Sequence, residues 1–524
     1  PGAALMNSKD FSEYCKAVKE DKTCEYYTNT RENNMQFTIG AKKTMEEIRS
    51  ILPAHVEVLT EACKEDKVCP YEITAGLSTK ARVIIADYHY IFHPSIRDMF
   101  FAKTNKRLDK AIVIVDEAHN LPRRIQSLMS SMLTGNMVKF AIKEAKKYEY
   151  PTIIEKLVAI QSTIVQLGGD LSREMGKKEK FIDKHKFIGI IEGKTLQPYQ
   201  ELIEEFETIS DAVRVLQKNS SIGSIANFLR SWQGPEEGYA RIMSIFHSKA
   251  GPTLKLAYRC LDPSVVAREI IEGSYSTVMM SGTLTPTTMY KDLLGFSEEV
   301  EECTFDNPFH ENNRLALVIP KTTTKYSQRS EQQFAAIGEI CKHIVDVVPG
   351  NSAIFFPSYY LRDQVHQHLA NTTKKTCFVE HPGMTKVEKM DFMERFKQYK
   401  ETGAVLLGAV SGNFAEGIDL PGDLLKCVVV VGLPLQTPDL ETKKLIEYYD
   451  KKFGRGWDYG YILPAFQKTL QGAGRCIRTE KDRGVVVFLD ERYAWPRYAR
   501  CFPDEYAVRV VEHPIDEIEH FFTK

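Results

Sequence analysis

The first regular pattern in the chain is a pair of continuous apolar runs, at residues 83–86 and 111–115. Runs of this kind are typical of strands buried on both faces of a parallel sheet, so they predict the start of an α/β domain. From about residue 121 to 240 the apolar residues recur at helical spacing among many Lys and Glu residues. This stretch predicts a helical insertion, which is clearest over 138–148, 153–167 and 199–215.

Strand-like runs return after residue 250 and continue toward the end of the chain. Two short runs, 254–258 and 276–280, come first. From about residue 320 apolar runs alternate regularly with helical patterns, and these runs are 353–356, 377–380, 405–409, 427–431 and 485–489. The alternation predicts a second parallel-sheet domain, so the expected fold class is α/β with two such domains.

Residues 1–75 are charged, weakly periodic and rich in cysteine. We expect helices over 44–52 and 56–62. The apolar content is slight, which predicts a small domain that needs a cross-link or a bound metal for stability. The cysteines follow the spacing Cys-x8-Cys-x38-Cys-x5-Cys, at Cys15, Cys24, Cys63 and Cys69. This spacing is too open for a structural zinc knuckle and is compatible with a [4Fe–4S] cluster held by thiolates. Four unligated cysteines are the alternative.

Composition narrows the class of protein without indicating a substrate. The chain has 43% apolar and 27% charged residues, within the range of globular proteins, and no apolar run is long enough to span a bilayer. Eleven cysteines in a large chain favour a reducing compartment over a disulfide scaffold. The net charge of −1 gives no electrostatic sign of nucleic-acid binding, so any basic surface must be local.

The sequence Asp-Glu-Ala-His at residues 116–119 directly follows the apolar run 111–115. An acidic pair at the carboxyl end of a strand suits an NTPase. Asp116 would order the Mg²⁺ that bridges the phosphates, and Glu117 would polarise the attacking water. The alternative is an ordinary helix start, where acidic side chains are favoured by the helix dipole.

A second motif, Gln-x-x-Gly-Arg-x-x-Arg, begins at Gln471 and contains Arg475 and Arg478. Two arginines three residues apart lie on one face of a helix. Guanidinium groups delivered from a second domain can neutralise charge on a transferring phosphoryl group, so both arginines are candidate arginine fingers. A surface helix with ordinary basic residues is the alternative.

Two loops with small, hydroxyl and acidic residues complete the set. One is Ser-Gly-Thr at 281–283, and the other is Glu-Gly-Ile-Asp at 416–419. Each is expected in a strand-to-helix loop, where it can contact phosphate or ribose. In their order along the chain, the four motifs form the motif set of a superfamily 2 helicase.

Further residues make this resemblance closer. Residues 86–94 (Ala-Asp-Tyr-His-Tyr-Ile-Phe-His-Pro) resemble the Tyr-His-Tyr stretch that precedes the acidic box in iron–sulfur helicases of the XPD type. Residues 355–359 (Phe-Phe-Pro-Ser-Tyr) resemble motif IV of that family. The cysteine-bearing leader and the helical insertion also occur where the family carries its iron–sulfur and Arch domains. The resemblance spans the chain.

The resemblance implies two RecA-like motor domains, with an iron–sulfur domain and a helical Arch domain inserted in the first. The expected boundaries are 1–75 for the iron–sulfur domain, 76–125 and 241–300 for motor domain 1, 126–240 for the Arch, and 301–524 for motor domain 2.

The resemblance also implies ATP and Mg²⁺ between the motor domains. Beside the catalytic residues, the expected nucleotide site contains His119, Gly282, Thr283, Glu416, Gly417, Asp419 and Gln471. The implied cluster ligands are Cys15, Cys24 and Cys69. Cys63 is the fourth ligand if the chain is complete, and a bystander if the family's first ligand lies upstream. Tyr71 and Trp457 are candidates for stacking on single-stranded DNA, with core packing as the alternative for both.

One required element is missing from the sequence. A helicase of this kind needs a phosphate-binding loop, Gly-x-x-x-x-Gly-Lys-Thr/Ser, upstream of the acidic box. The chain has Gly-Lys-Thr only at 193–195, inside the helical insertion and without the first glycine. We therefore expect about a hundred further residues, with the phosphate loop, ahead of residue 1.

The implied function is 5′-to-3′ translocation on single-stranded DNA with unwinding of duplexes, in nucleotide excision repair. A damage-inducible (DinG-like) helicase and a non-catalytic DNA-binding scaffold are the alternatives. Expected partners are single-stranded and forked DNA and other repair proteins, without a membrane. The expected state is a monomer in the cytoplasm of an archaeal or bacterial cell, or in the nucleus of a eukaryotic one.

Overall fold

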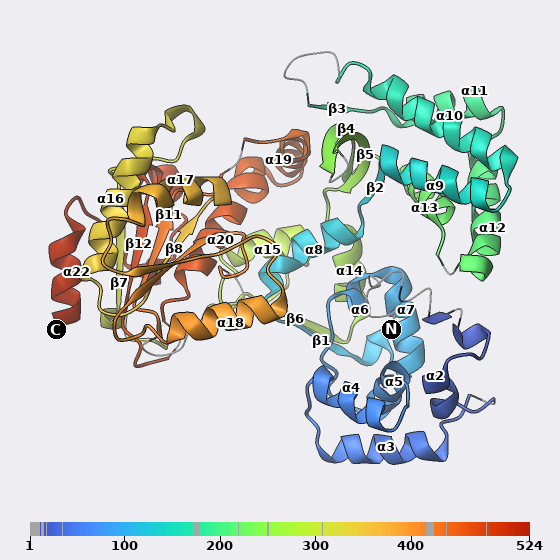
Figure 1. Ribbon diagram of the computed structural model, residues 1–524, viewed down its shortest axis with the longest axis horizontal. Helices are drawn as coiled ribbons and strands as arrows, with labels where there is room; N and C mark the ends of the chain where they lie inside the picture. The colour runs from blue at the N-terminus through green and yellow to red at the C-terminus, as the bar shows by residue number, and fades with distance from the viewer. Residues whose placement is uncertain are drawn as a thin grey trace. The chain divides into compact units, whose positions relative to one another are not determined.

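The structure is a computed structural model that describes residues 11, 15, 16, 18–33, 35–171, 178–217, 219–248, 251–306, 308–415, 424–435, 437–477 and 479–523 (Figure 1). The chain divides into two compact units. The first contains residues 1–281, 290–298 and 439–444, and the second contains 282–289, 299–438 and 445–524. Among the described helices, none is long and apolar enough to cross a membrane.

The cysteine-bearing segment folds into short helices around a small core. The helices are α2 (Glu25–Thr30), α3 (Ile39–Ser50), α4 (Val56–Glu65) and α5 (Pro70–Lys80). Thr38 caps α3 by accepting a hydrogen bond from the Ala41 backbone N–H, and Pro70 fills the first position of α5. The core consists of Ala41, Ile48, Cys63, Val68 and Ile73. Both helices expected from the sequence are therefore present, with longer bounds.

Two strands form a parallel pair in the region expected to be motor domain 1. They are β1 (Ile112–Val115) and β6 (Ser276–Met279). Burial alternates along β1, so only one face of the strand is covered within the described part of the chain. The apolar side chains exposed on this pair include Ile112 (61%), Ile114 (63%), Val278 (44%) and Met280 (48%). The expectation that β1 is buried on both faces is thus wrong, because no described segment covers its second face. The other helices of this region are α6 (His89–Phe92), α7 (Pro94–Thr104), α8 (Leu121–Leu128), α14 (Ser264–Gly273) and α15 (Thr287–Leu294).

The strand expected at 83–86 does not form. The backbone there pairs with no described strand, and Val83 and Ile85 are 79% and 94% exposed. An apolar run becomes a strand only when another strand supplies its hydrogen bonds, and no described segment does so here.

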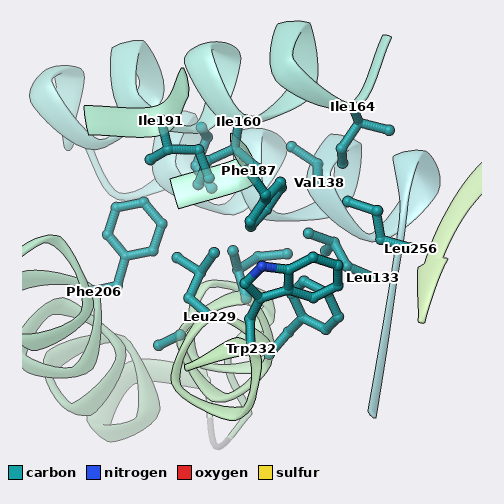
Figure 2. Packing of buried hydrophobic residues seen from close by; sticks show 14 of the residues in the cluster. Leu133, Val138, Ile160, Ile164, Phe187, Ile191, Phe206, Leu229, Trp232 and Leu256 are labelled. Atoms are coloured by element: carbon teal, nitrogen blue, oxygen red, sulfur yellow. The ribbon is translucent and has the colours of Figure 1, made fainter. Parts of the chain in front are cut away.

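The helical insertion combines a helix bundle with an antiparallel sheet. Its helices are α9 (Gly135–Lys147), α10 (Pro151–Gly168), α11 (Lys184–Thr195), α12 (Tyr199–Gln217) and α13 (Ser221–Trp232). The sheet has the order β2-β5-β4-β3, with β2 (Ser131–Thr134), β3 (Glu179–Phe181), β4 (Tyr239–Ser248) and β5 (Gly251–Cys260). Figure 2 shows the Trp232 indole in the core between the helices, and its ring centroid lies 4.7 Å from that of Phe187.

Strands β4 and β5 belong with these helices and not with a motor sheet. Tyr239, Met243, Leu256 and Tyr258 lie in the same buried cluster as the helical side chains. The helical insertion therefore continues through β5, beyond the expected boundary at residue 240. Apolar runs in a hairpin and in a parallel sheet look alike in sequence, which explains the difference.

The second unit contains a parallel sheet with the strand order β13-β7-β12-β11-β8-β10-β9. The strands are β7 (Arg314–Ile319), β8 (Ser352–Phe356), β9 (Thr376–Val379), β10 (Ala404–Ala409), β11 (Cys427–Val431), β12 (Gly484–Leu489) and β13 (Arg509–Val510). The helices are α16 (Glu331–Val347), α17 (Tyr359–Leu369), α18 (Lys386–Lys397), α19 (Leu440–Phe453), α20 (Leu463–Ala473), α21 (Pro496–Ala499) and α22 (Pro514–Thr523). The predicted parallel-sheet domain and its five strands are confirmed.

Helices cover both faces of this sheet. Leu315 and Leu317 of β7 belong to the core that includes Ile337 of α16, whereas Ala316 and Val318 of the same strand belong to the core on the opposite face. In Figure 1, α16 and α22 lie along one side of the sheet. Burial on both faces explains why the central strands are continuous apolar runs.

Trp232→Ala should destabilise the helical insertion by about 3–5 kcal/mol, because it removes a fully buried indole and leaves a cavity. Hydrogen exchange of the α9–α13 amides measures this free energy locally. Phe140→Ala is the matched control, since Phe140 is 59% exposed on α9 and its loss should change protection little. Equal effects of the two substitutions would contradict the packing described here.

Candidate nucleotide and cluster sites

The acidic box forms a tight turn at the carboxyl end of β1. Glu117 has φ 48° and ψ 40°, a left-handed conformation that is unfavourable for a residue with a side chain. The Asp116 carboxylate accepts a hydrogen bond of 2.8 Å from the Glu117 backbone N–H. Both carboxylates are thus presented at the strand end, and the Glu117 side chain is 62% exposed. This is the position that the sequence predicted for them.

The Ser-Gly-Thr loop meets this turn through its serine. Ser281 Oγ donates to Glu117 Oε2 at 3.0 Å and lies 2.6 Å from His119 Nδ1. The His119 ring is buried and lies 3.2 Å from the same Glu117 oxygen. The backbone N–H of Ala118 also donates to Met280 O at 3.0 Å. The structure therefore brings the predicted Glu117 and His119 together with Ser281, which sequence reasoning quoted in the motif but did not select as a site residue.

Gly282 and Thr283 follow directly in the chain. Gly282 is exposed, and a Cβ placed on it would meet nothing within 4 Å, so its backbone is open to a ligand. Thr283 is half-buried.

In the second unit, the Gln-x-x-Gly-Arg motif lies at the end of α20. Gln471 is in the last turn of this helix, which ends at Ala473. Arg475 therefore lies in the turn after the helix, and the expectation that it sits on a helix face is wrong. The Gly474 backbone N–H still donates to Leu470 O, at 2.8 Å, and the helix ends there. Arg475 Nε donates to Ala415 O at 3.0 Å, which joins this turn to the loop that follows β10. Arg478, Glu416, Gly417 and Asp419 lie outside the described residues.

A buried carboxylate holds the loop that follows β10. Glu380 is fully buried directly after β9, and it accepts hydrogen bonds from the Tyr359 hydroxyl at 2.9 Å and from the Ala409 backbone N–H at 3.0 Å. It also accepts one from the Asn413 backbone N–H. A Cβ at Gly412 would lie 2.5 Å from both carboxylate oxygens, so only glycine fits there without a shift. Sequence reasoning did not select Glu380; the signal for it was a charged residue closing an apolar run.

Cys15, Cys24 and Cys69 are each partly buried, and burial raises the pKa of the Cys15 and Cys69 thiols. Cys24 and Cys69 each immediately precede a helix, α2 and α5. The backbone N–H of Cys69 donates to Thr30 Oγ1 at 2.6 Å, which ties the start of α5 to the end of α2.

Cys63 has a different environment. It is fully buried in the small apolar core, and burial raises its pKa to about 11. This favours a packing role. Within the described residues, no group of three or more His, Cys, Asp or Glu side chains is arranged to hold a metal ion.

Both candidate stacking residues are exposed aromatics beside cations. Tyr71 is 48% exposed, and Lys103 Nζ lies 4.4 Å from its ring centroid. Trp457 is 50% exposed, and the Arg497 guanidinium lies 5.5 Å from its ring. Neither belongs to a buried core, although Trp457 also packs edge-on against Tyr461 at 5.5 Å.

Two family models match the chain. Residues 341–508 match the model described as a helicase C-terminal domain, and residues 3–138 match the model named DEAD_2. The similar curated proteins are helicases as well. The ATP-dependent DNA helicase DDX11 of Mus musculus is 24% identical, with 93% of this chain and 63% of that protein covered. Over these segments the chain is similar to superfamily 2 helicases of the XPD type.

Other relatives agree with this assignment. The ATP-dependent DNA helicase CHL1 of Candida albicans is 26% identical over 84% of this chain and 59% of its own length. The general transcription and DNA repair factor IIH helicase subunit XPD/RAD3 of Saccharomyces cerevisiae is 23% identical over 86% of this chain and 68% of its own length. The chain thus spans less than two thirds of the length of the first two relatives.

Solved structures agree on the fold. An XPD helicase matches with a TM-score of 0.61 at 20% identity, over 93% of this chain and 84% of that chain. The Xpd4 protein of S. tokodaii matches with a TM-score of 0.56 at 18% identity, over 81% of each chain. The predicted RecA-like α/β fold is confirmed.

Gly412→Ala should destabilise the second unit by about 1–3 kcal/mol, because the added methyl group collides with the buried Glu380 carboxylate. Chemical denaturation of the variant checks this. Gly189→Ala on α11 is the control, since a Cβ there meets nothing within 4 Å and alanine favours a helix. A Gly412→Ala variant as stable as the parent would show that the loop is not held as described.

Proposed function

We propose that the protein containing this chain is an ATP-dependent DNA helicase that moves 5′ to 3′ on single-stranded DNA, unwinds duplexes and acts in nucleotide excision repair. The observation that carries the proposal is the cluster of Glu117, Ser281 and His119 at the carboxyl ends of two paired strands. The relatives are DNA helicases and a DNA repair factor, which supports DNA as the substrate. A DNA substrate would place its action in the nucleus of a eukaryotic cell or in the cytoplasm of an archaeal or bacterial one.

The acidic turn supplies the groups for phosphoryl transfer to water. Asp116 would hold Mg²⁺, which would supply positive charge against the charge that develops on the phosphates. This ion needs only one or two protein carboxylates, because it keeps several waters, and the exposed Asp116 fits that role. Glu117 accepts the proton of the attacking water, and Ser281 holds the carboxylate by donating to Oε2 at 3.0 Å. In the proposal Gly282, Thr283 and His119 complete this side of the nucleotide site.

The two arginines would supply positive charge, and the loop at 416–419 would couple the nucleotide to the DNA. Arg475, with Arg478, is proposed to neutralise charge on the transferring phosphoryl group. The hydrogen bond from Arg475 to Ala415 supports a link to the following residues, Glu416, Gly417 and Asp419. Through that link, binding and hydrolysis of the nucleotide would be coupled to the residues that contact DNA.

We place the phosphate loop on a further segment that covers the exposed apolar face of β1 and β6. Ile112 and Ile114 expose more than half of their surface there, and large exposed apolar patches mark interaction sites. Residues 83–86 would gain a strand partner from the same segment. The acidic turn beside this apolar face keeps both carboxylates and their hydrogen-bonding partners. This argues against the alternative that the protein is a non-catalytic DNA-binding scaffold.

Cys15, Cys24 and Cys69 are proposed to hold a [4Fe–4S] cluster that staples the small domain. The hydrogen bond from the Cys69 N–H to Thr30, which joins the start of α5 to α2, supports a shared site, and the burial of Cys63 in the apolar core assigns it no ligand role in the proposal. Tyr71 and Trp457 would stack on bases of single-stranded DNA, each with a cation beside it for the backbone phosphates.

The proposed division of the chain has an iron–sulfur domain at 1–75, motor domain 1 at 76–125 and 261–300, a helical Arch at 126–260, and motor domain 2 from 301. The size of the helical Arch favours an XPD-type repair helicase over a DinG-like one. Single-stranded and forked DNA and other repair proteins are the proposed partners of a monomer.

Glu117→Gln in the full-length protein should retain ATP and DNA binding and lose unwinding, with DNA-stimulated ATP hydrolysis falling by about 10²–10⁴-fold. The amide keeps the shape of the side chain but cannot accept a proton from water. Glu155→Gln on the exposed face of α10 is the charge-matched control and should behave as the parent. Unwinding at the parent rate by Glu117→Gln would remove Glu117 from the catalytic role.

Cys69→Ser in the full-length protein should lose iron, the brown absorbance and duplex unwinding, while keeping much of the DNA-stimulated ATPase. The small domain has a slight core and depends on its staple, whereas nucleotide binding is proposed between the motor domains. Cys63→Ala is the control and should retain iron. Iron content, ATPase and unwinding are measured on one preparation. Zinc in place of iron would refute the cluster, and full iron in Cys69→Ser would remove Cys69 from the ligand set.

A further inference from the structure

Tyr88 makes a long-range contact with the acidic turn. Its hydroxyl donates to Asp116 O at 2.5 Å and lies 3.2 Å from Glu117 O. These are main-chain oxygens, so the contact acts on the path of the backbone and leaves both carboxylates free to act on ligands. The next residue in the chain, His89, is the first residue of the short helix α6. This helix holds the backbone from which the Tyr88 side chain extends.

The turn that Tyr88 contacts needs external support. Glu117 adopts a left-handed backbone conformation, which costs about 1–2 kcal/mol for a residue other than glycine. Such a conformation persists only where neighbouring contacts hold it. Within the turn, the Asp116 carboxylate accepts from the Glu117 N–H, and Ala118 N–H donates to Met280 O. Among the described residues, Tyr88 adds a contact to this turn from outside β1 and β6.

The hydroxyl remains a donor at neutral pH. Burial raises the pKa of Tyr88, and the nearby negative charges of Glu117 and Asp116 raise it further. The phenol therefore stays protonated in the range where a helicase works.

We infer that Tyr88 is a positioning residue that holds the Glu117 backbone so that its carboxylate meets the attacking water. The inference rests on the proposed ATPase function. Ser281 fixes the carboxylate end of Glu117 and Tyr88 fixes the main-chain end, so the side chain is held at both ends. A shift of the backbone by a fraction of an ångström would misplace the base, and misplaced catalytic groups lower turnover strongly.

Tyr88 also connects the acidic turn to the cysteine-bearing segment. It lies shortly after α5, and Lys106 Nζ donates to Thr79 O and to Ala81 O, both at 3.0 Å, at the end of that helix. At the start of α5, the buried Glu72 carboxylate accepts from Lys103 Nζ at 2.8 Å. These contacts hold both ends of α5 against α7 and the residues that follow it, a few residues before Tyr88 in the chain.

The test compares Tyr88→Phe with Tyr90→Phe in the full-length protein. Tyr88→Phe keeps the ring and removes only the donor, so kcat for DNA-stimulated ATP hydrolysis should fall about tenfold, the effect of one lost hydrogen bond. KM for ATP and the unfolding temperature should stay near the parent values. Tyr90 packs its ring against Phe100 at 5.3 Å, and no hydrogen bond of its hydroxyl is found among the described residues, so Tyr90→Phe should leave kcat unchanged.

A donor at the same place should restore turnover. p-Aminophenylalanine at position 88 keeps an N–H group where the hydroxyl lies and should recover most of kcat. A parent-like kcat for Tyr88→Phe, with Glu117→Gln inactive, would overturn the positioning role and leave the proposed function intact. A loss of kcat that comes with a lower unfolding temperature and is not restored by p-aminophenylalanine would mean a structural role only. Parent-like turnover in both Tyr88→Phe and Glu117→Gln would instead overturn the proposed function.

Discussion

The parallel pairing of β1 with β6 is the constraint on which the candidate site depends. Its register sets Val115 opposite Met279. Because parallel strands end at the same edge, the acidic turn after β1 and the serine after β6 must emerge together, although 164 positions separate Glu117 from Ser281. The contact between them follows from main-chain hydrogen bonding, which tolerates sequence change. The same register places the Ala118 N–H against Met280 O and closes the turn.

The long insertion between these strands leaves their register undisturbed for a topological reason. Its first strand, β2, pairs antiparallel with its last strand, β5, so that Ser131 lies opposite Tyr258. The chain therefore leaves and returns at one place, and the bundle builds its core on its own side of that junction. A domain with close ends can be inserted into a sheet at small cost, because little chain has to be strained to close the loop.

Sequence reasoning succeeded where one local pattern decides the structure. A continuous apolar run followed by an acidic pair predicted the turn at 116–119, and the regular alternation after residue 320 predicted the second sheet with its strand positions. It failed where the outcome depends on a distant partner. Residues 83–86 have the apolar content of a strand but lack a pairing strand, and β4 and β5 pair with each other instead of with β1. Arg475 was misplaced because α20 ends at Ala473, and the hydrogen bond from Arg475 to Ala415 joins two segments that are far apart in the sequence.

Contacts that join distant residues were the least accessible from sequence, and they use the same device in both units. Tyr88 holds the turn after β1, and Glu380 holds the loop after β10. Each is a polar side chain from a neighbouring segment that binds main-chain groups of a strand-end loop. Loops at these positions have exposed backbone and would otherwise sample several conformations. A fixed hydrogen-bonding partner removes that freedom before a ligand binds, so the catalytic groups need less reorganisation during the reaction. The partner acts on the backbone, and any residue that can reach and hydrogen-bond the same atoms could serve. Spacing along the chain therefore does not reveal it, and only the folded contact does.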